Sequence, residues 1–444
     1  MNAVHRFNPA NAVHASSPAS AVRTLSLALA LAFSALPFFT PAQADYLPDP
    51  KAAEAALWAS PSVMQSRGNV AAQSLRGQSL QQGRDEWKVD AEASQRRIQP
   101  SPSENFAEWG LALSRPIRMP GRAEADRALA GALNAHAEAS LGEALHESGR
   151  QLLMLWFDWL NQSSQANLWQ AQQQLVEQQL ATVNSRIRLG EAPRSERVNA
   201  EAALAQIRLQ QQQAATRLQQ ARNRLLAQFP ALPLTADTTL PPPGSPGFDG
   251  SAEAYVNAVL EHNHELFRAR RQADALQAEA RQLARLRSVD PSVGVFYRNE
   301  MGGNEHIVGL GVGLTLPGGA RRTDQAAAAQ LATTAQEAAT LLEQRLRMDA
   351  RADYETAVAQ VANWQQAQQA AQALDEAARL ATRAYSLGEG GLDQVLMNRR
   401  LALEGQLMAQ QVQLDALAAN ARLKLDSHQL WPLDVETDSA HAHP

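Results

Sequence analysis

The sequence predicts a mainly α-helical protein with a small β part, in which a strand pair and a long helical hairpin occur twice. The 444 residues are 45% hydrophobic but only 5% aromatic and are rich in Ala and Gln, which is typical of long helices. Leu-Gly-Glu occurs at 189–191 and at 387–389, and 388 − 190 gives a spacing of 198 residues. Pro-Gly pairs begin at 120 and 317, and 317 − 120 gives 197. A whole supersecondary unit is therefore duplicated.

Charge and cysteine content exclude several classes of function. The formal net charge of −5 leaves no basic surplus to neutralise phosphates, so we predict no nucleic-acid partner. The absence of cysteine excludes disulfides, thiolate metal sites, a cysteine nucleophile and a lipid attached through cysteine. The chain has no Gly-rich phosphate loop, nucleophile elbow or metalloprotease helix. We therefore predict no enzyme activity, no catalytic residue and no cofactor.

Two histidine pairs have the residue type of metal ligands. They are His262 with His264 and His441 with His443. Neither pair has a carboxylate or cysteine framework around it, so we predict no metal site.

The first 44 residues have the pattern of a signal peptide. Arg23 precedes an apolar run at 25–39, and Ala-Gln-Ala at 42–44 supplies the small residues that signal peptidase reads. The predicted mature N-terminus is Asp45. The alternative is an uncleaved anchor, which the length disfavours because a bilayer requires about 20 apolar residues.

The first repeat covers residues 45–228. Alternating apolar and polar residues predict strands, and proline-free intervals rich in Ala, Gln, Leu, Glu and Arg predict helices. We place these elements at about 86–98, 107–118, 121–188 and 195–228, with a preceding N-terminal helix at 51–75. The helix at 121–188 would be about 100 Å long. It would end at Gly190 in a left-handed cap, and the chain would restart near Ser195.

A Pro- and Gly-rich linker at 229–250 precedes the second repeat at 251–427. We predict its strands and helices at about 251–287, 292–300, 306–316, 321–386 and 393–426, and a C-terminal tail at 428–444. Asp393 is the predicted N-cap of the last helix. That helix returns only partway along its partner, and the N-terminal helix is placed to supply the other half of its path.

The predicted strands have an apolar face opposite a polar or glycine face. Such strands fit a membrane barrel with lipid outside and water inside, and they also fit a half-buried hairpin of a soluble sheet. Four strands cannot close a barrel, because the smallest closed barrels need about eight. In the membrane interpretation several chains must therefore contribute.

At this point the chain resembles the outer-membrane factors, the TolC-like family of efflux and secretion ducts. The resemblance covers essentially the whole mature chain and is strongest in Arg-Ile-Arg-Leu-Gly-Glu-Ala at 186–192 and in Tyr-Ser-Leu-Gly at 385–388, followed by Asp393. The stretch at 293–322 resembles the heavy-metal-efflux, CzcC-like branch of that family.

The resemblance implies a homotrimer held in outer-membrane lipid by a 12-stranded β-barrel, which continues as a periplasmic α-helical barrel. Its tips would dock on a periplasmic adaptor protein that serves an inner-membrane pump, and metal cations or drugs would leave passively. Two alternatives stay open: the outer-membrane duct of a type I protein secretion system, and a soluble periplasmic coiled-coil or adaptor protein. The sequence does not identify the cargo.

We predict that the two turns form the periplasmic tip, the gate and the adaptor contact. Glycines would permit the turns, acids could form rings that favour cations, and arginines could pair with those acids and close the tip. The competing interpretation is ordinary helix caps and surface ion pairs. The predicted site residues are Arg186, Arg188, Leu189, Gly190, Glu191, Arg194, Tyr385, Leu387, Gly388, Glu389, Gly390, Gly391 and Asp393.

Overall fold

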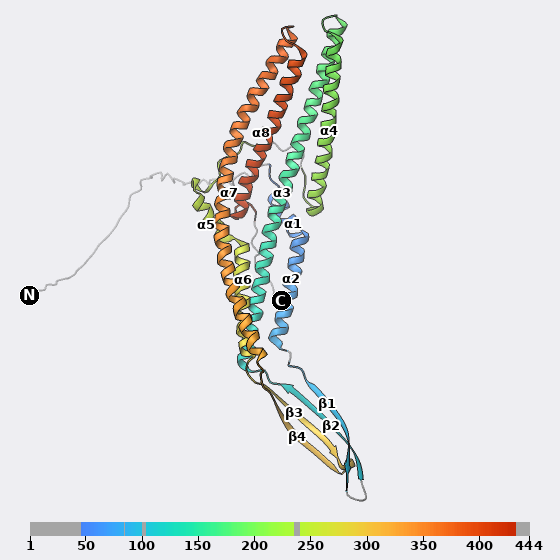
Figure 1. Ribbon diagram of the computed structural model, residues 1–444, viewed down its shortest axis with the longest axis vertical. Coiled ribbons are helices and arrows are strands. Elements are labelled where there is room, and N and C mark those ends of the chain that lie inside the picture. Colours follow the sequence, from blue (N-terminus) through green and yellow to red (C-terminus); the bar gives the residue numbers. More distant parts are fainter. Residues whose placement is uncertain (1–45, 84, 100–103, 235–239, 432–444) are drawn as a thin grey trace, which may run out of the picture. The chain divides into compact units, whose positions relative to one another are not determined.

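The computed structural model describes residues 46–83, 85–99, 104–234 and 240–431, all within the unit Asp45–Pro444. It is mainly helical with one 4-stranded sheet (Figure 1), which confirms the predicted fold class. The predicted signal peptide and residues 432–444 of the predicted tail lie outside the described residues. None of the helices that the structure describes has the length and hydropathy needed to cross a bilayer.

The first hairpin consists of α3 (Pro120–Arg188) and α4 (Arg194–Gln228). α3 begins with proline at its first position, where the missing N–H costs nothing, and has no interior proline. Its 69 residues span about 104 Å at 1.5 Å per residue. Ion pairs from Arg208 to Glu177 (2.9 Å) and from Arg224 to Asp158 (2.6 Å) hold α4 against the C-terminal half of α3.

The second hairpin repeats this arrangement with α7 (Ala320–Ser386) and α8 (Leu392–Asp426). α8 covers the C-terminal half of α7, and Gln406 Nε2 donates to Asp375 Oδ1 at 3.4 Å. The N-terminal half of α7 instead contacts α6 (His264–Arg285), where Arg270 pairs with Glu343 at 2.8 Å. Figure 1 shows the two hairpins side by side within this unit.

Two predicted helices are each broken once. The predicted helix at 251–287 is α5 (Ala252–His262) followed by α6, because buried Asn263 has φ −70° and ψ 109° and caps α6 by accepting from the Leu266 N–H at 2.8 Å. The predicted helix at 51–75 is α1 (Pro50–Trp58) followed by α2 (Pro61–Gln82), since Pro61 starts a new helix.

α8 and α2 lie end to end along α3. Near the end of α8, Asp426 accepts a hydrogen bond from Arg150 of α3 at 2.9 Å. Just before α2, Ser60 accepts one from Ser148 at 3.0 Å, two residues away on the same helix. α2 then runs toward the start of α3, where Arg118 donates to the Leu80 carbonyl at 2.8 Å. The N-terminal segment therefore supplies the second half of the path that α8 begins.

The sheet has the order β1 (Lys88–Ile98), β2 (Glu104–Pro116), β3 (Asp290–Glu300) and β4 (Glu305–Thr315), with all neighbours antiparallel. The β2–β3 pairing joins the two repeats. β1 and β4 are the edges of this sheet in the single chain. Exposed edges present unpaired N–H and C=O groups that another chain can satisfy.

The two faces of the sheet differ sharply in chemistry. One face carries exposed aliphatic side chains, among them Val308 (78% exposed), Leu310 (84%) and Val312 (73%). The other face has glycines and charged residues, and a Cβ added at Gly309 would lie only 2.3 Å from the ring of Phe296. An exposed apolar surface of this extent marks contact with a lipid or protein partner.

Candidate functional site at the helical tips

The two helical turns have the same backbone structure. Gly190 has φ +75° and Gly388 has φ +80°, the left-handed conformation that favours glycine. The N–H of Glu191 donates to the Arg186 carbonyl at 2.9 Å, and the N–H of Glu389 donates to the Ala384 carbonyl at 2.9 Å. These 6→1 bonds, with the 5→2 bonds beside them, are Schellman caps in both hairpins. The duplicated tripeptide therefore encodes a duplicated turn.

The helices that follow the turns start differently from the prediction. Gly390 and Gly391 are not among the residues with positive φ, and Gly391 (φ −89°, ψ 154°) is the N-cap of α8. The predicted N-cap at Asp393 is wrong, because Asp393 lies inside the first turn of α8. Likewise α4 begins at Arg194 behind an N-cap at Pro193, so Ser195 is already helical.

The two hairpins pack together just behind the turns. A buried apolar cluster there is formed by residues from all four helices: Val183, Ala200, Tyr385, Leu392 and Val395. Tyr385 is only 3% exposed, although it lies three residues before Gly388. The tip is therefore a packed unit in which each hairpin covers the other.

Tyr385 lies at the centre of a polar network within this unit. Its hydroxyl donates to Glu196 Oε2 of α4 at 2.6 Å. The guanidinium carbon of Arg186 lies 4.3 Å from the centroid of its ring, a cation–π contact, and Arg186 Nη1 donates to the Tyr385 carbonyl at 3.4 Å. Burial, and then the hydrogen bond to Glu196, raise the pKa of the Tyr385 hydroxyl. The hydroxyl therefore remains a donor.

Two further contacts cross between the hairpins. Asn199 of α4 donates to Asp393 Oδ1 of α8 at 3.1 Å. Arg399 of α8 donates to Leu175 O of α3 at 3.3 Å and to Thr382 Oγ1 of α7 at 3.4 Å. Burial lowers the pKa of the Arg399 guanidinium. Glu196, Asn199 and Arg399 were not among the predicted site residues, because their partners lie on the other repeat.

The predicted arginine–acid pairing at the tip does not form among the described residues. Arg186 instead contacts Tyr385, and Arg188 donates to Ser185 Oγ at 3.0 Å. Neither these two nor Arg194 forms an ion pair with a predicted tip acid in the described part of the chain. The remaining predicted residues are mostly solvent-exposed: Leu189, Gly190, Glu191, Arg194, Leu387, Gly388, Glu389, Gly391 and Asp393, with Gly390 half-buried.

A groove lies between the hairpins beside this network. Its walls include Arg186 and Glu191 from the first repeat and Tyr385, Leu387 and Arg399 from the second. Leu189 (73% exposed) and Leu387 (63%) are the large apolar side chains at the two turns. The tip thus offers a groove lined by both polar and apolar side chains, with two exposed leucines at the turns.

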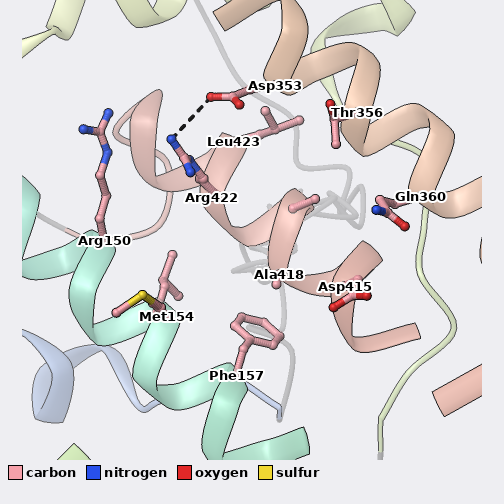
Figure 2. Close-up of a pocket in the computed structure, with 12 residues that line it drawn as sticks. Arg150, Met154, Phe157, Asp353, Thr356, Gln360, Asp415, Ala418, Arg422 and Leu423 are labelled. Carbon is pink, nitrogen blue, oxygen red and sulfur yellow. Dashed lines mark ion pairs between the residues drawn. The ribbon is translucent and has the colours of Figure 1, made fainter. Parts of the chain in front are cut away.

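A second groove lies at mid-length between α3, α7 and α8 (Figure 2). Arg422 of α8 points toward Asp353 of α7, with 3.5 Å between Nη2 and Oδ2, while Met154 and Phe157 of α3 form another wall. Arg422 also lies 3.5 Å from Asp426, which accepts from Arg150. This chain of charges joins α3, α8 and α7 halfway along the helices.

Four histidines meet beside that chain of charges. His146 and His264 lie 5.8 Å apart between ring centroids, and His428 lies 4.8 Å from His264 and 5.3 Å from His262. No group of three or more His, Asp or Glu side chains is arranged to hold a metal ion in the described ranges. The second predicted pair, His441 and His443, lies outside those ranges.

Burial and neighbouring charges shift two pKa values in this region. Burial, then Arg150 and the neighbouring histidines, lower the pKa of His146 to about 2. Burial, then Glu265, raise the pKa of Glu143 to about 7. Near neutral pH His146 is therefore an uncharged core residue.

Comparison with known proteins gives similarity only at the level of structure. No family model matches the sequence, and no curated protein matches it. A membrane protein from Pseudomonas aeruginosa is similar with a TM-score of 0.66 at 17% identity, over 87% of this chain and 93% of that one.

Named outer-membrane proteins are also similar. The Campylobacter jejuni CmeC outer membrane channel has a TM-score of 0.66 at 14% identity, over 88% of each chain. The outer membrane protein VceC from Vibrio cholerae has a TM-score of 0.62 at 18% identity, over 86% of this chain and 99% of that one. The predicted likeness to TolC-like outer-membrane factors is thus confirmed in fold. The chain has the fold of these outer membrane channels.

Proposed function

We propose that this chain is the outer-membrane channel of an efflux system and that three copies form one duct. The observation that carries the proposal is the sheet, which has one exposed apolar face and two open edges. Three copies would supply 12 strands, pair every edge and close a barrel of a size found in outer membranes. A four-stranded sheet that stayed alone would leave both edges exposed.

The apolar face has the dimensions of a membrane-spanning band. It begins at Trp109 and Tyr297, whose rings lie 5.3 Å apart, and continues along β2 to Met119 just before α3. The ten steps from Trp109 to Met119, of which seven lie within β2 and three in the extended segment after it, give about 34 Å at about 3.4 Å each. At a tilt of about 45° this corresponds to a height of about 24 Å, close to the apolar band of outer-membrane barrels.

The helices would then extend into the periplasm. Because α3 starts directly after β2 and is about 104 Å long, its tip lies about that far from the sheet. The exposed Leu189 and Leu387 and the groove between the hairpins are the surface on which a periplasmic adaptor would dock. An inner-membrane pump would supply the energy, and the duct would supply a water-filled path.

The first experiment separates this proposal from its rivals. Inner and outer membranes of expressing cells are separated, the protein is extracted with detergent, and the mass of the native complex is measured. We expect an outer-membrane trimer that runs as a compact species on gels until it is heated. A periplasmic monomer obtained without detergent would contradict the proposal and favour the coiled-coil or adaptor alternative.

A second experiment addresses the cargo. Growth of a deletion strain is measured on metal cations and on drugs, and secretion of proteins is compared with the parent strain. The predicted heavy-metal branch leads us to expect sensitivity to metal cations, restored by the wild-type gene. Sensitivity to drugs alone would contradict that branch and leave the channel role intact, whereas loss of a secreted protein would indicate a type I secretion duct.

A further inference from the structure

A single cation, Arg115, lies on the apolar face of the sheet between the strand positions level with Trp109 and those level with Trp87. Residues that pair across β1–β4 form rows on this face. From the row that contains Trp109 to the row that contains Trp87, the other side chains are aromatic, aliphatic or small, apart from Asn299 and His306 in the Trp109 row. Arg115 is the exception. It lies on the row of Val293 and Val312, at the end of the sheet from which the helices start.

Arg115 is held in place but is not neutralised. Its Nε donates to the Asp85 carbonyl at 2.9 Å, and its guanidinium carbon lies 5.4 Å from the centroid of Trp87. No carboxylate lies within ion-pair distance of it in the described residues. On the opposite face Arg96 pairs with Glu108 (2.8 Å) and Glu300 (2.7 Å). The sheet therefore neutralises cations on its polar face and leaves this one open.

The surroundings of Arg115 match the chemistry of a lipid. Trp87 (62% exposed), Ile117 (45%) and Val293 (44%) are exposed apolar side chains near it on the same face. Trp is favoured at the headgroup level of a membrane, and a lipid-facing Arg costs about 2–4 kcal/mol at mid-membrane but about 0–1 kcal/mol near the interface. A guanidinium whose Nε is already bound still has its Nη groups for phosphate oxygens.

A neighbouring copy would not neutralise Arg115 either. In the proposed trimer, β1 of one copy lies beside β4 of the next. On its apolar face β4 carries His306, Val308, Leu310, Val312 and Leu314, with no carboxylate. The charge of Arg115 would therefore have no carboxylate partner from the neighbouring copy in the proposed trimer either.

We propose that Arg115 and Trp87 form a binding site for the headgroup phosphate of a glycerophospholipid in the periplasmic leaflet. The site rests on the proposed membrane location of the sheet. Arg115 binds the phosphate through its Nη groups, Trp87 covers the guanidinium at headgroup level, and Ile117 and Val293 contact the acyl chains.

The test measures lipid bound to the purified full-length protein. Detergent-extracted wild type, R115Q, R115K and R97Q are titrated with dioleoylphosphatidylglycerol and observed by native mass spectrometry. Arg97 is the matched control, because it lies on the same face at the far end of β1 and has neither an aromatic platform nor an ion pair in the described residues. Inorganic phosphate as competitor separates a lipid site from a simple anion site.

We expect saturable binding near one lipid per chain in wild type and R97Q. R115Q should bind about tenfold more weakly, because a charge-assisted hydrogen bond is lost, and R115K should be intermediate. Equal binding by R115Q, equal loss in R97Q, or no saturation in wild type would each overturn the site. Displacement by millimolar phosphate would likewise overturn a lipid-specific site.

Membrane insertion is measured in parallel by flotation and by the heat-dependent gel shift. If R115Q does not insert, the saturation of wild type and the weaker binding of R115K decide the question. If wild type itself does not insert, the proposed channel function fails. If the trimer inserts but R115Q binds lipid as tightly as wild type, only the proposed lipid site is contradicted.

Discussion

The Tyr385 hydroxyl of α7 donates a 2.6 Å hydrogen bond to Glu196 of α4, joining the second hairpin to the first directly behind the two turns. The guanidinium of Arg186 lies over the face of the same ring. Because the bond runs to a carboxylate and is half-buried, it stabilises the packed tip more than a neutral surface contact would. In the proposed channel these contacts oppose separation of the hairpins.

Replacing Tyr385 with Phe should loosen the tip while preserving its apolar packing. The lost bond to a charged group is worth about 1.5–3 kcal/mol. We expect higher single-channel conductance of the reconstituted trimer. Tyr354→Phe is the matched control, since its hydroxyl has only a 3.4 Å bond to the Gly247 carbonyl at mid-length. Unchanged conductance in Y385F with normal trimer formation would show that this bond does not restrain the tip.

Replacing Gly388 with Pro should abolish efflux while leaving membrane insertion intact. Proline fixes φ near −65°, whereas Gly388 has φ +80° and donates its N–H to the Tyr385 carbonyl at 3.1 Å. Gly391→Ala is the control, because φ −89° suits any L-residue. Efflux is measured as cargo tolerance of the complemented deletion strain. Normal tolerance with G388P would remove the turn from the proposed docking role.

The His146 and Glu143 side chains predict how stability depends on pH. The folded pKa of His146, about 2, lies below its ordinary 6.5, so its contribution is present above pH 6.5 and falls as pH drops toward 2. The folded pKa of Glu143, about 7, lies above 4.5, so its contribution is present below pH 4.5 and falls as pH rises to 7. Between pH 4.5 and 6.5 the two effects cancel.

Acid sensitivity from this pair should therefore appear below about pH 4.5. Below pH 4.5, of these two groups only His146 changes the free energy of unfolding, by about 1.4 kcal/mol per pH unit. The thermal unfolding midpoint of each protein is measured at several pH values and compared with its own midpoint at pH 6. Between pH 4.5 and 3, the midpoint of His146→Asn should fall less than that of wild type. His136→Asn on the same helix is the control. Parallel curves for wild type and H146N would contradict the assignment.

Asp290 joins the start of β3 to both long helices. Its Oδ1 accepts from Arg122 of α3 at 2.9 Å and its Oδ2 from Arg321 of α7 at 2.8 Å. Asn has one acceptor oxygen and no charge, so D290N should lower stability by about 1–2 kcal/mol after allowing for partial exposure. Thermal unfolding of the detergent-extracted trimer measures this. Asp324→Asn, at an exposed position of α7, should leave the midpoint unchanged.

Gly309 on β4 leaves room for the Phe296 ring of β3. A Cβ there would lie 2.3 Å from that ring, whereas a Cβ at Gly311 would meet nothing within 4 Å. G309A should therefore lower the temperature at which the folded sheet is lost on gels, and G311A should not. Adding Phe296→Ala should restore G309A, because it removes the clash. A double variant as weak as G309A would point to another cause.

Local patterns predicted the elements whose signals are local. Gly190 and Gly388 repeat within similar helices, so the turns could be found from sequence, and alternation located the four strands. The break at Asn263 was missed because asparagine occurs both inside helices and as an N-cap, and the local sequence does not distinguish the two. Asp393 was placed as a cap because acids are common there, yet Gly391 has that position.

Contacts between the repeats could not be predicted from sequence. The sequence suggested that Arg186 would pair with a tip acid such as Glu191 or Glu389. Its partner is instead Tyr385, which is 199 residues away. The histidine group likewise combines His146 of α3, His264 of α6 and His428 of the turn that follows α8. The local sequence indicates which helices form. Which side chains contact each other across the hairpins depends on how the two hairpins pack together.

The end-to-end placement of α8 and α2 makes the helical fold cyclic rather than linear. Ser148 and Arg150, which contact Ser60 and Asp426, are about 3 Å apart along the axis of α3. A circular permutant that omits α1, links the end of α8 to the start of α2 by a short loop and opens the chain after α4 would keep α2 to α8 in place. In the permutant, the second hairpin and α2 would be consecutive in the chain. The order of the helices along the chain would then match their order in space.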